Sequence, residues 1–226
     1  MRGARAVALA ATLFLAGSPR GAAAFERVGP WSFGSWYGVG FPAANDINNQ
    51  VDLANLAFSS DITPFESNHE ATGDLRRELS KKLAAEMRAG YWWKRRGEGL
   101  YTRRISAIPL ELGVIYTALS SRRFRAGFTG AGGVLFDATY AGEDPLGGVN
   151  TSGTGAIGEL GLTGEMALSE AWSVQGRAVG RYAVARHVLP GGGDLDFSGI
   201  SLAIGLRVSF DTRPKGEAPA DSTEKK

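Results

Sequence analysis

Ten charged residues interrupt the apolar segments of this 226-residue chain, and within each segment they occupy positions of one parity. Five are acidic and five are basic: Glu86, Arg88, Glu111, Arg125, Asp137, Glu159, Glu165, Arg177, Arg181 and Arg207. Carboxylates and guanidinium groups in equal number on one face can satisfy one another through charge-assisted hydrogen bonds. We therefore expect an internal network of ion pairs, and the question becomes which elements hold it.

The elements that carry these charges are eight segments in which apolar and polar residues alternate. A period of two is typical of β-strands, and most of the segments reach the roughly 9–11 residues that a tilted membrane strand requires. The expected strands are 32–42, 72–79, 83–93, 105–119, 124–140, 154–168, 172–188 and 200–210. Glycine, at 32 of 226 residues, marks bends and close backbone approach inside strands and favours a closed, curved sheet.

The two faces of these strands differ in polarity. In the last six strands the apolar face carries almost no charge, whereas the opposite face carries all ten charged residues. Lipid outside and a charged lumen satisfy both faces. Since an eight-stranded barrel is only wide enough to be filled by its own side chains, the network is expected to block a continuous water path. A gated ion or solute path lined by the same charges is the alternative.

The expected connections alternate in length. Three are short, at 80–82, 120–123 and 169–171, and four are long, at 43–72, 94–103, 141–153 and 189–196. Short turns on one side and long loops on the other are typical of outer-membrane barrels. The fold class we predict is all-β: an eight-stranded antiparallel up-and-down transmembrane β-barrel with short periplasmic turns and long extracellular loops.

Two segments also fit a helix. Residues 74–87 place Leu75, Leu79, Leu83 and Met87 four apart, the spacing of an amphipathic helix, although removing two strands there would leave fewer than the eight of the smallest bacterial barrels. Two strands are therefore predicted, with a helix as the alternative. Residues 45–58 in the first long loop also show helical spacing of apolar residues. A short helix at the barrel mouth and an irregular loop fit that segment equally well.

Aromatic residues gather near the expected strand ends, where a membrane interface would need them. At the short-turn end these are Phe33, Phe124, Trp172 and Phe210. Towards the long-loop end they are Phe41, Tyr91, Trp93, Tyr140 and Tyr182.

The two ends of the chain have a different composition. Residues 1–24 follow the order basic, apolar and small, which is the plan of a cleaved secretory signal, and cleavage is expected between Ala24 and Phe25. This removes three arginines and no acid, so 25 basic residues fall to 22 against 23 acidic ones, and the mature charge of about −1 gives no case for a nucleic-acid partner. Residues 25–210 form the barrel, and residues 211–226 are expected to be a disordered periplasmic tail.

The last strand, "AIGLRVSF" (203–210), resembles the C-terminal assembly signal of outer-membrane barrels, with Gly205, Val208 and the aromatic Phe210 at its characteristic positions. Together with "YWWKRRGEG" and "RFRAGFTGAGGVLF", residues 31–210 resemble the small OmpA/OmpW-like outer membrane protein beta-barrel domain family. The resemblance implies the outer membrane of a Gram-negative bacterium. It also implies surrounding lipid and lipopolysaccharide, folding by the barrel assembly machinery and periplasmic chaperones, and a monomer.

Three functions follow from this interpretation. The first is a non-enzymatic barrel that anchors surface loops, with loop 43–72 expected to carry any recognition. The second is a narrow passive channel for small or apolar solutes, as in OmpW. The third is a lipid A deacylase-type hydrolase, but the His-x-Ser-Asn run of that family is absent: His187 lies in "ARHVLPGGG" and is expected to face the lumen as an ordinary polar residue.

Cofactor and metal chemistry have little support in the sequence. The chain has no cysteine and two histidines, so thiolate sites are excluded and a His-rich metal site is not expected. We expect no catalytic residues, no cofactor and no metal.

Overall fold

The computed structural model describes residues 31–42, 45–58, 62–98, 101–121, 123–144, 147–169 and 171–210. The expected leader with its cleavage site at Ala24 and Phe25, and the expected tail 211–226, lie outside these residues. The elements are β1 (Trp31–Pro42), α2 (Asn45–Phe58), β2 (Asn68–Glu78), β3 (Leu83–Glu98), β4 (Tyr101–Ser120), β5 (Phe124–Asp144), β6 (Gly147–Ala167), β7 (Trp172–Leu189), β8 (Gly193–Asp196) and β9 (Gly199–Phe210).

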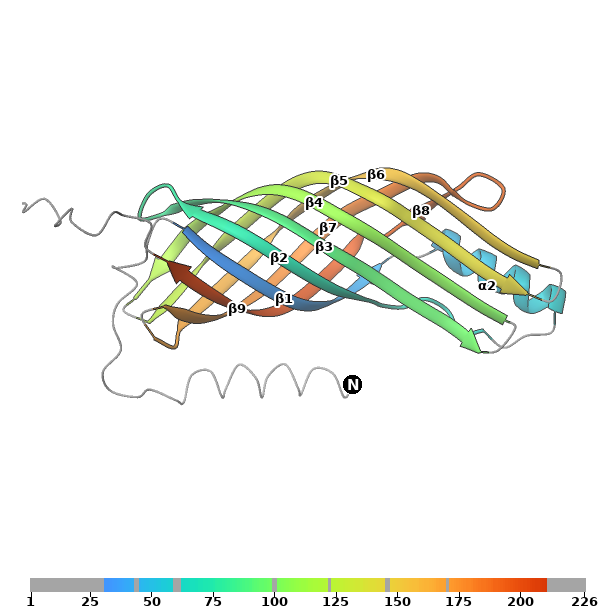
Figure 1. Cartoon of the computed structure of the whole chain (residues 1–226), viewed down its shortest axis with the longest axis horizontal. Helices are drawn as coiled ribbons and strands as arrows, with labels where there is room; N and C mark the ends of the chain where they lie inside the picture. The colour runs from blue at the N-terminus through green and yellow to red at the C-terminus, as the bar shows by residue number, and fades with distance from the viewer. Residues whose placement is uncertain are drawn as a thin grey trace, which may run out of the picture.

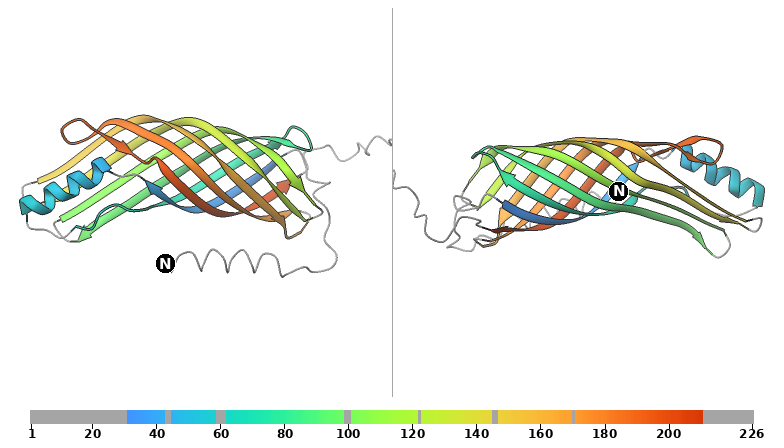
Figure 2. Two further views of the ribbon diagram at one scale, coloured as in Figure 1. Left: turned by 180° about the vertical axis from the view of Figure 1, so that it is seen from behind. Right: turned by 45° about the horizontal axis from the view of Figure 1, so that its top comes forward.

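The strands form one closed antiparallel barrel (Figures 1 and 2). Consecutive strands pair from β1 to β7, and β9 closes the ring by pairing with both β1 and β7. Trp31 on the first strand lies opposite Phe210 on the last, so both ends of the barrel domain meet at one rim. The short β8 pairs with β7 alone and is not a member of the ring. The predicted eight-stranded up-and-down barrel is confirmed.

The segment that also fitted a helix forms two strands. β2 and β3 pair antiparallel over Glu78↔Ala84 to His69↔Trp93, and the chain reverses at residues 79–82. The Ser80 hydroxyl accepts hydrogen bonds from the backbone N–H groups of Lys82 and Leu83, at 3.3 and 3.1 Å. Alternation of buried and exposed side chains therefore overrode the helix propensity of this segment, because the barrel needs both strands to close.

The long connections are more ordered than the sequence suggested. Residues 45–58 form helix α2, which lies at the end of the barrel opposite the short turns (Figure 1). The loops expected at 94–103 and 141–153 are instead continuations of hairpins, because β3 runs to Glu98, β4 begins at Tyr101, β5 runs to Asp144 and β6 begins at Gly147. The barrel is therefore much longer on this side than the expected strands would make it.

A bulge in β5 changes the predicted faces. Asp137 has φ 44°, in the left-handed region that non-glycine residues rarely adopt, and the registers with β4 and β6 both shift close to this residue. One extra residue reverses the alternation beyond the bulge. The prediction that Asp137 faces the lumen is wrong, because it is exposed, and the prediction that Tyr140 lies in an outer aromatic band is wrong, because it is 3% exposed.

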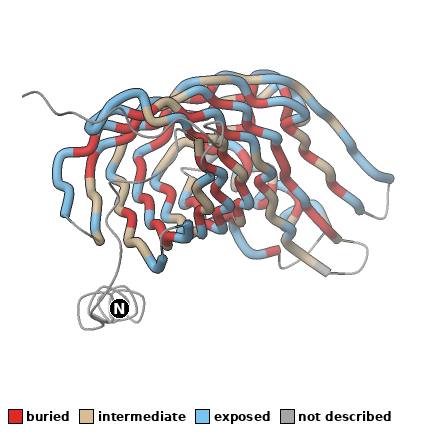
Figure 3. The backbone as a smooth tube through the Cα atoms, turned by 60° about the vertical axis from the view of Figure 1, so that its left-hand side comes forward, coloured by how far each residue is buried: buried red, intermediate tan, exposed pale blue. Residues whose placement is uncertain are grey.

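Over the short-turn half, the buried residues of each strand alternate with exposed or partly buried ones (Figure 3). The exposed face over the short-turn half is strongly apolar, with Leu160 75% and Leu112 68% exposed. Phe33, Phe124, Trp172 and Phe210 are exposed at the short-turn rim, and Phe41, Tyr91 and Tyr182 are exposed at the other end of this apolar belt. Among the described residues, no helix is long and apolar enough to cross a membrane.

Candidate functional site

Eight of the ten predicted lumen charges are buried inside the barrel: Glu86, Arg88, Glu111, Glu159, Glu165, Arg177, Arg181 and Arg207. Arg125 is partly buried at the short-turn end, and Asp137 is excluded by the bulge. The structure thus brings nine of the ten into one lumen, where most of them fall into three groups.

The group nearest the middle of the barrel is centred on Glu159. One carboxylate oxygen of Glu159 pairs with Arg88 and the other with Arg181, each at 2.6 Å. Arg88 also pairs with Glu86 at 3.2 Å and lies 3.5 Å from Glu111. A chain of alternating charges therefore crosses the lumen between strands that are not neighbours.

Arg181 extends this group towards β2. Its Nη2 donates to Glu70 at 2.9 Å, and the Ser201 hydroxyl donates to the same carboxylate at 2.7 Å. Its guanidinium carbon lies 3.9 Å from the ring centroid of Trp92, which is a cation–π arrangement.

The second group is built around Arg207. The guanidinium pairs with Asp74 at 2.8 Å, and it donates to Gln175 at 3.0 Å and to the Ser32 hydroxyl at 2.8 Å. Trp36 donates its indole N–H to the other oxygen of Asp74. Each of the three guanidinium nitrogens thereby has a polar partner, as burial of a charge requires.

The third group lies at the short-turn end. Arg76 pairs with Glu78 at 2.9 Å and with Glu165 at 3.1 Å, while Arg125 pairs with Glu78 at 3.0 Å. The cavity beside Arg76 and Glu165 has a volume of only about 10 Å³, which is about the space of one water molecule. The ion pairs of this group therefore leave little free space beside Arg76 and Glu165.

Arg177 differs from the other buried arginines. It stacks over Trp36 with 5.0 Å between the guanidinium carbon and the ring centroid. Its Nε and Nη1 have no hydrogen-bond partner among the described residues. The cation–π contact is thus the interaction that orients this side chain.

Sequence reasoning missed the contribution of β2. Glu70, Asp74 and Arg76 are all buried in the network, and they share one parity with Thr72. A strand beginning at Asn68 instead of Thr72 would have included Glu70, and assigning faces to that strand would have revealed the other two. Two positions of β1 are glycine for a steric reason: a Cβ on Gly34, opposite Asp74, would clash with the Asp74 carboxylate, and one on Gly40 would clash with the side chains of Asn68 and Glu70.

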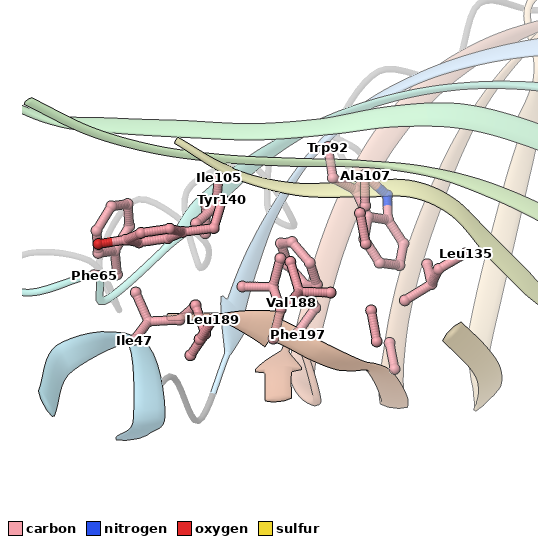
Figure 4. Packing of buried hydrophobic residues seen from close by; sticks show 14 of the residues in the cluster. Ile47, Phe65, Trp92, Ile105, Ala107, Leu135, Tyr140, Val188, Leu189 and Phe197 are labelled. Atoms are coloured by element: carbon pink, nitrogen blue, oxygen red, sulfur yellow. The ribbon is translucent and has the colours of Figure 1, made fainter. Parts of the chain in front are cut away.

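Beyond the charge network the interior becomes apolar (Figure 4). Trp92, 1% exposed, stacks on Arg181 on one side and packs against Phe197 on the other, with 5.6 Å between the two ring centroids. The cluster above it, here called the apolar plug, joins residues from many parts of the barrel mouth: Ile47, Val51, Ile62, Phe65, Trp92, Ile105, Ala107, Leu135, Ala138, Tyr140, Ile157, Ala183, Ala185, Val188, Leu189, Leu195 and Phe197.

Helix α2 closes the plug. Ile47, Val51 and Ala54, at helical spacing, are buried, and Asp46 lies in the first turn, where a negative charge stabilises the helix dipole. Two asparagines tie the helix to the segment that follows it. Asn48 accepts from the Phe65 N–H at 2.7 Å and Asn55 accepts from the Ile62 N–H at 2.9 Å.

No catalytic arrangement emerges around His187. The expectation that it faces the lumen is wrong, because the register of β7 with β8 shifts between Ala185 and Leu189, and His187 is exposed with φ 58°. Its backbone N–H donates to Asp194 at 3.0 Å. Within the described part of the chain, no group of three or more His, Asp or Glu side chains could hold a metal ion.

A pocket of about 570 Å³ lies at the long end of β3, β4 and β5, where Tyr91, Trp93, Arg95, Arg104 and Glu143 contribute to its lining. The rings of Tyr91 and Trp93 are stacked at 5.6 Å, and Arg104 donates to the Tyr91 hydroxyl at 2.9 Å. Burial, and to a smaller extent the charge of Arg96, lowers the pKa of Lys94 at the same pocket. Sequence reasoning assigned most of these residues to loops and gave the pocket no role.

Comparison with known proteins gives the fold. No family model matches the chain, and no curated protein matches it. The crystal structure of Ail, the attachment invasion locus protein of Yersinia pestis, superposes with a TM-score of 0.51 at 10% identity, covering 81% of this chain and 99% of Ail. The fold is that of a small outer-membrane barrel. The outer membrane protein OprG from Pseudomonas aeruginosa gives a TM-score of 0.41 at 15% identity, covering 84% of this chain and 98% of OprG.

Proposed function

We propose that this chain is an integral outer-membrane barrel whose lumen is sealed, and that it serves as a rigid, non-enzymatic anchor for the surface formed by α2, the β7–β8 hairpin and the long ends of β3 to β6. The observation that carries this proposal is a reversal of polarity along the barrel. In the short-turn half the interior is charged and the exterior is apolar, and beyond Trp92 the apolar plug occupies the interior.

The short-turn half is suited to lipid. Its exterior presents leucine, isoleucine and aromatic side chains from strands all around the ring. Leaving such a surface in water costs about 25 cal/mol per Å², whereas a bilayer removes that cost. Closure of the ring satisfies the backbone hydrogen bonds of every strand, which is what a membrane-spanning sheet requires. Short turns then face the periplasm and α2 faces the exterior of the cell.

The sealed lumen argues against transport. A permeating solute would have to displace the ion pairs of Glu159 and then the apolar plug beneath α2. These two barriers differ in kind, because the first is a network of buried ion pairs and the second is a cluster of apolar side chains. The same arrangement disfavours the narrow-channel alternative. The hydrolase alternative has no support in the exposed position of His187. On this proposal the chain is a monomer that contacts outer-membrane lipid and, during folding, the assembly machinery and periplasmic chaperones.

The test is to refold the mature chain into lipid vesicles and then to record planar-bilayer conductance. Folding is established first, by migration on a gel that changes on boiling and by a β-type circular dichroism spectrum. We expect folded protein to give no sustained conductance steps under conditions in which a known porin does. Steady single-channel conductance from folded protein would favour the channel, and release of acyl chains from lipid A would favour the hydrolase.

A further inference from the structure

The hairpin of β3 and β4 places like charges directly opposite each other. Arg95 lies opposite Arg104, and Arg96 lies opposite Arg103. Like charges at such positions are destabilising. Arg103 is buried and donates to the backbone carbonyls of Thr102 and Glu143, at 2.9 and 2.8 Å. The Arg95–Arg104 pair has no comparable compensation.

Arg95 and Arg104 lie on the same face as Trp93, on the exposed side of the wall. Arg104 donates to the phenol oxygen of Tyr91, and neither arginine has an ion-pair partner among the described residues. Two adjacent guanidinium groups with unused donors form an arrangement that suits a phosphate, because each presents a planar fork to two oxygens.

The pocket around this pair adds shape and chemistry. The stacked rings of Tyr91 and Trp93 form an aromatic wall beside the arginines, and rings of this kind pack well against the apolar face of a sugar. Glu143, which also lines the pocket, accepts a hydrogen bond from the Thr102 hydroxyl at 3.2 Å. A carboxylate there can accept hydrogen bonds from sugar hydroxyls.

The pocket lies directly above the apolar belt. Arg104 precedes the exposed Ile108 by four residues on β4, and Leu110 and Leu112 continue the same outer face. Four residues of a strand span roughly 13 Å. A molecule with its anionic group between the two arginines could therefore lay acyl chains along Ile108 and Leu110.

We propose that this pocket binds the phosphorylated headgroup of an outer-leaflet glycolipid. The phosphate lies between Arg95 and Arg104, the sugar packs against Trp93 and Tyr91, and the acyl chains follow the outer face of β4. This proposal rests on the proposed function, since only a barrel embedded in that leaflet meets such a lipid. It identifies a ligand for the outer surface of β3, β4 and β5 just above the apolar belt.

The experiment measures lipid binding by the folded mature chain in neutral detergent micelles. The variant Arg95→Gln/Arg104→Gln removes both cations of the pocket. The variant Arg123→Gln/Arg186→Gln, at the short-turn end and on the distant β7, removes the same total charge elsewhere. Each protein is titrated with bis-phosphorylated lipid A, with its dephosphorylated form and with inorganic phosphate. Heat-modifiable migration is checked for each protein before titration, so that a failure to form the barrel is seen separately.

We expect the unaltered protein to bind phosphorylated lipid A at least ten-fold more tightly than the dephosphorylated form. The pocket variant loses at least ten-fold of that affinity, and the charge-matched control stays within two-fold. Equal affinity in the pocket variant would overturn the proposal. Competition by inorganic phosphate at concentrations near those of the lipid would also overturn it, because the site would then recognise a free anion and not a lipid.

Discussion

The two halves of the barrel use the same fold with opposite chemistry. In the short-turn half, Glu159 bridges Arg88 and Arg181 inside the wall, while Leu160, the next residue on β6, is 75% exposed outside it. In the long-loop half, Ile105 and Tyr140 are buried inside, and the exposed Arg95 and Arg104 lie opposite each other on the outer face. The change occurs at Trp92, which contacts both Arg181 and Phe197.

The difference between the two halves indicates that the environment of the outer face determines which side chains fill the interior of the barrel. On the proposed placement, the half surrounded by lipid gains nothing by burying more apolar surface, so directional ion pairs fix its interior. A half surrounded by water folds as soluble barrels do, with an apolar interior. Net stabilisation by buried ion pairs is small after desolvation, but removal of one partner is costly. The predictions below separate these two modes.

Loss of one central carboxylate should have the largest effect. Glu159→Gln keeps the side-chain size but leaves Arg88 and Arg181 without the charge they share, which costs about 3–5 kcal/mol for a broken buried pair. The measurement is reversible urea unfolding in lipid vesicles. Asp137→Asn is the control, since this exposed carboxylate should shift stability by less than about 0.5 kcal/mol. Equal effects of the two variants would mean that the ion-pair network does not stabilise the short-turn half.

A charge on the outer face should distinguish the two halves on one strand. Leu160→Arg places a guanidinium at lipid depth and should destabilise the folded barrel by about 2–4 kcal/mol. Ser152→Arg, on the same outer face of β6 but above the belt, should cost about 0–1 kcal/mol. The assay is again unfolding in vesicles. If both variants lost the same stability, the polarity reversal would not mark the membrane boundary.

Truncation of a side chain in the apolar plug should loosen the packing of α2 and leave the short-turn half folded. Ile47→Ala removes a fully buried side chain from α2 and should cost about 2 kcal/mol, at the lower end for such changes. Limited proteolysis of residues 45–58 reports the loosening, while heat-modifiable migration should be unchanged. Leu53→Ala on the exposed side of α2 should leave cleavage as it was. Loss of heat modifiability in Ile47→Ala would show that the two halves fold as one unit.

The smallest expected effect tests the fit of β1 to the network. Gly34→Ala would push a Cβ against the Asp74 carboxylate, which pairs with Arg207, and overpacking of this kind costs roughly 1–2 kcal/mol. At Gly176 a Cβ would meet no atom within 4 Å, so Gly176→Ala should be neutral. The unfolding midpoint in urea compares the two. A neutral Gly34→Ala would mean that Asp74 can move without loss of its ion pair.

Alternation along the strands was enough to predict the ring, the short turns and eight of the buried charges, because lipid outside and side chains inside impose a strict period of two. The alternation gave the wrong face for Asp137 and Tyr140, because one extra residue in β5 shifts which positions face the lumen. Nothing in "LFDATY" marks this bulge. It also missed Glu70, because the expected strand began at residue 72 and β2 begins at residue 68. The plug was missed because residues as distant in sequence as Ile47 and Leu189 join one cluster only in the closed barrel.

The central claim is that the polarity reversal marks the membrane boundary, and single cysteines test it most directly because the chain has none of its own. Leu160→Cys and Ser152→Cys, each labelled with an environment-sensitive dye, lie on one face of β6, roughly 26 Å apart along the strand. In vesicles, the account predicts blue-shifted emission quenched by spin-labelled lipid at position 160, and aqueous emission without such quenching at position 152. Aqueous emission at both positions would contradict it.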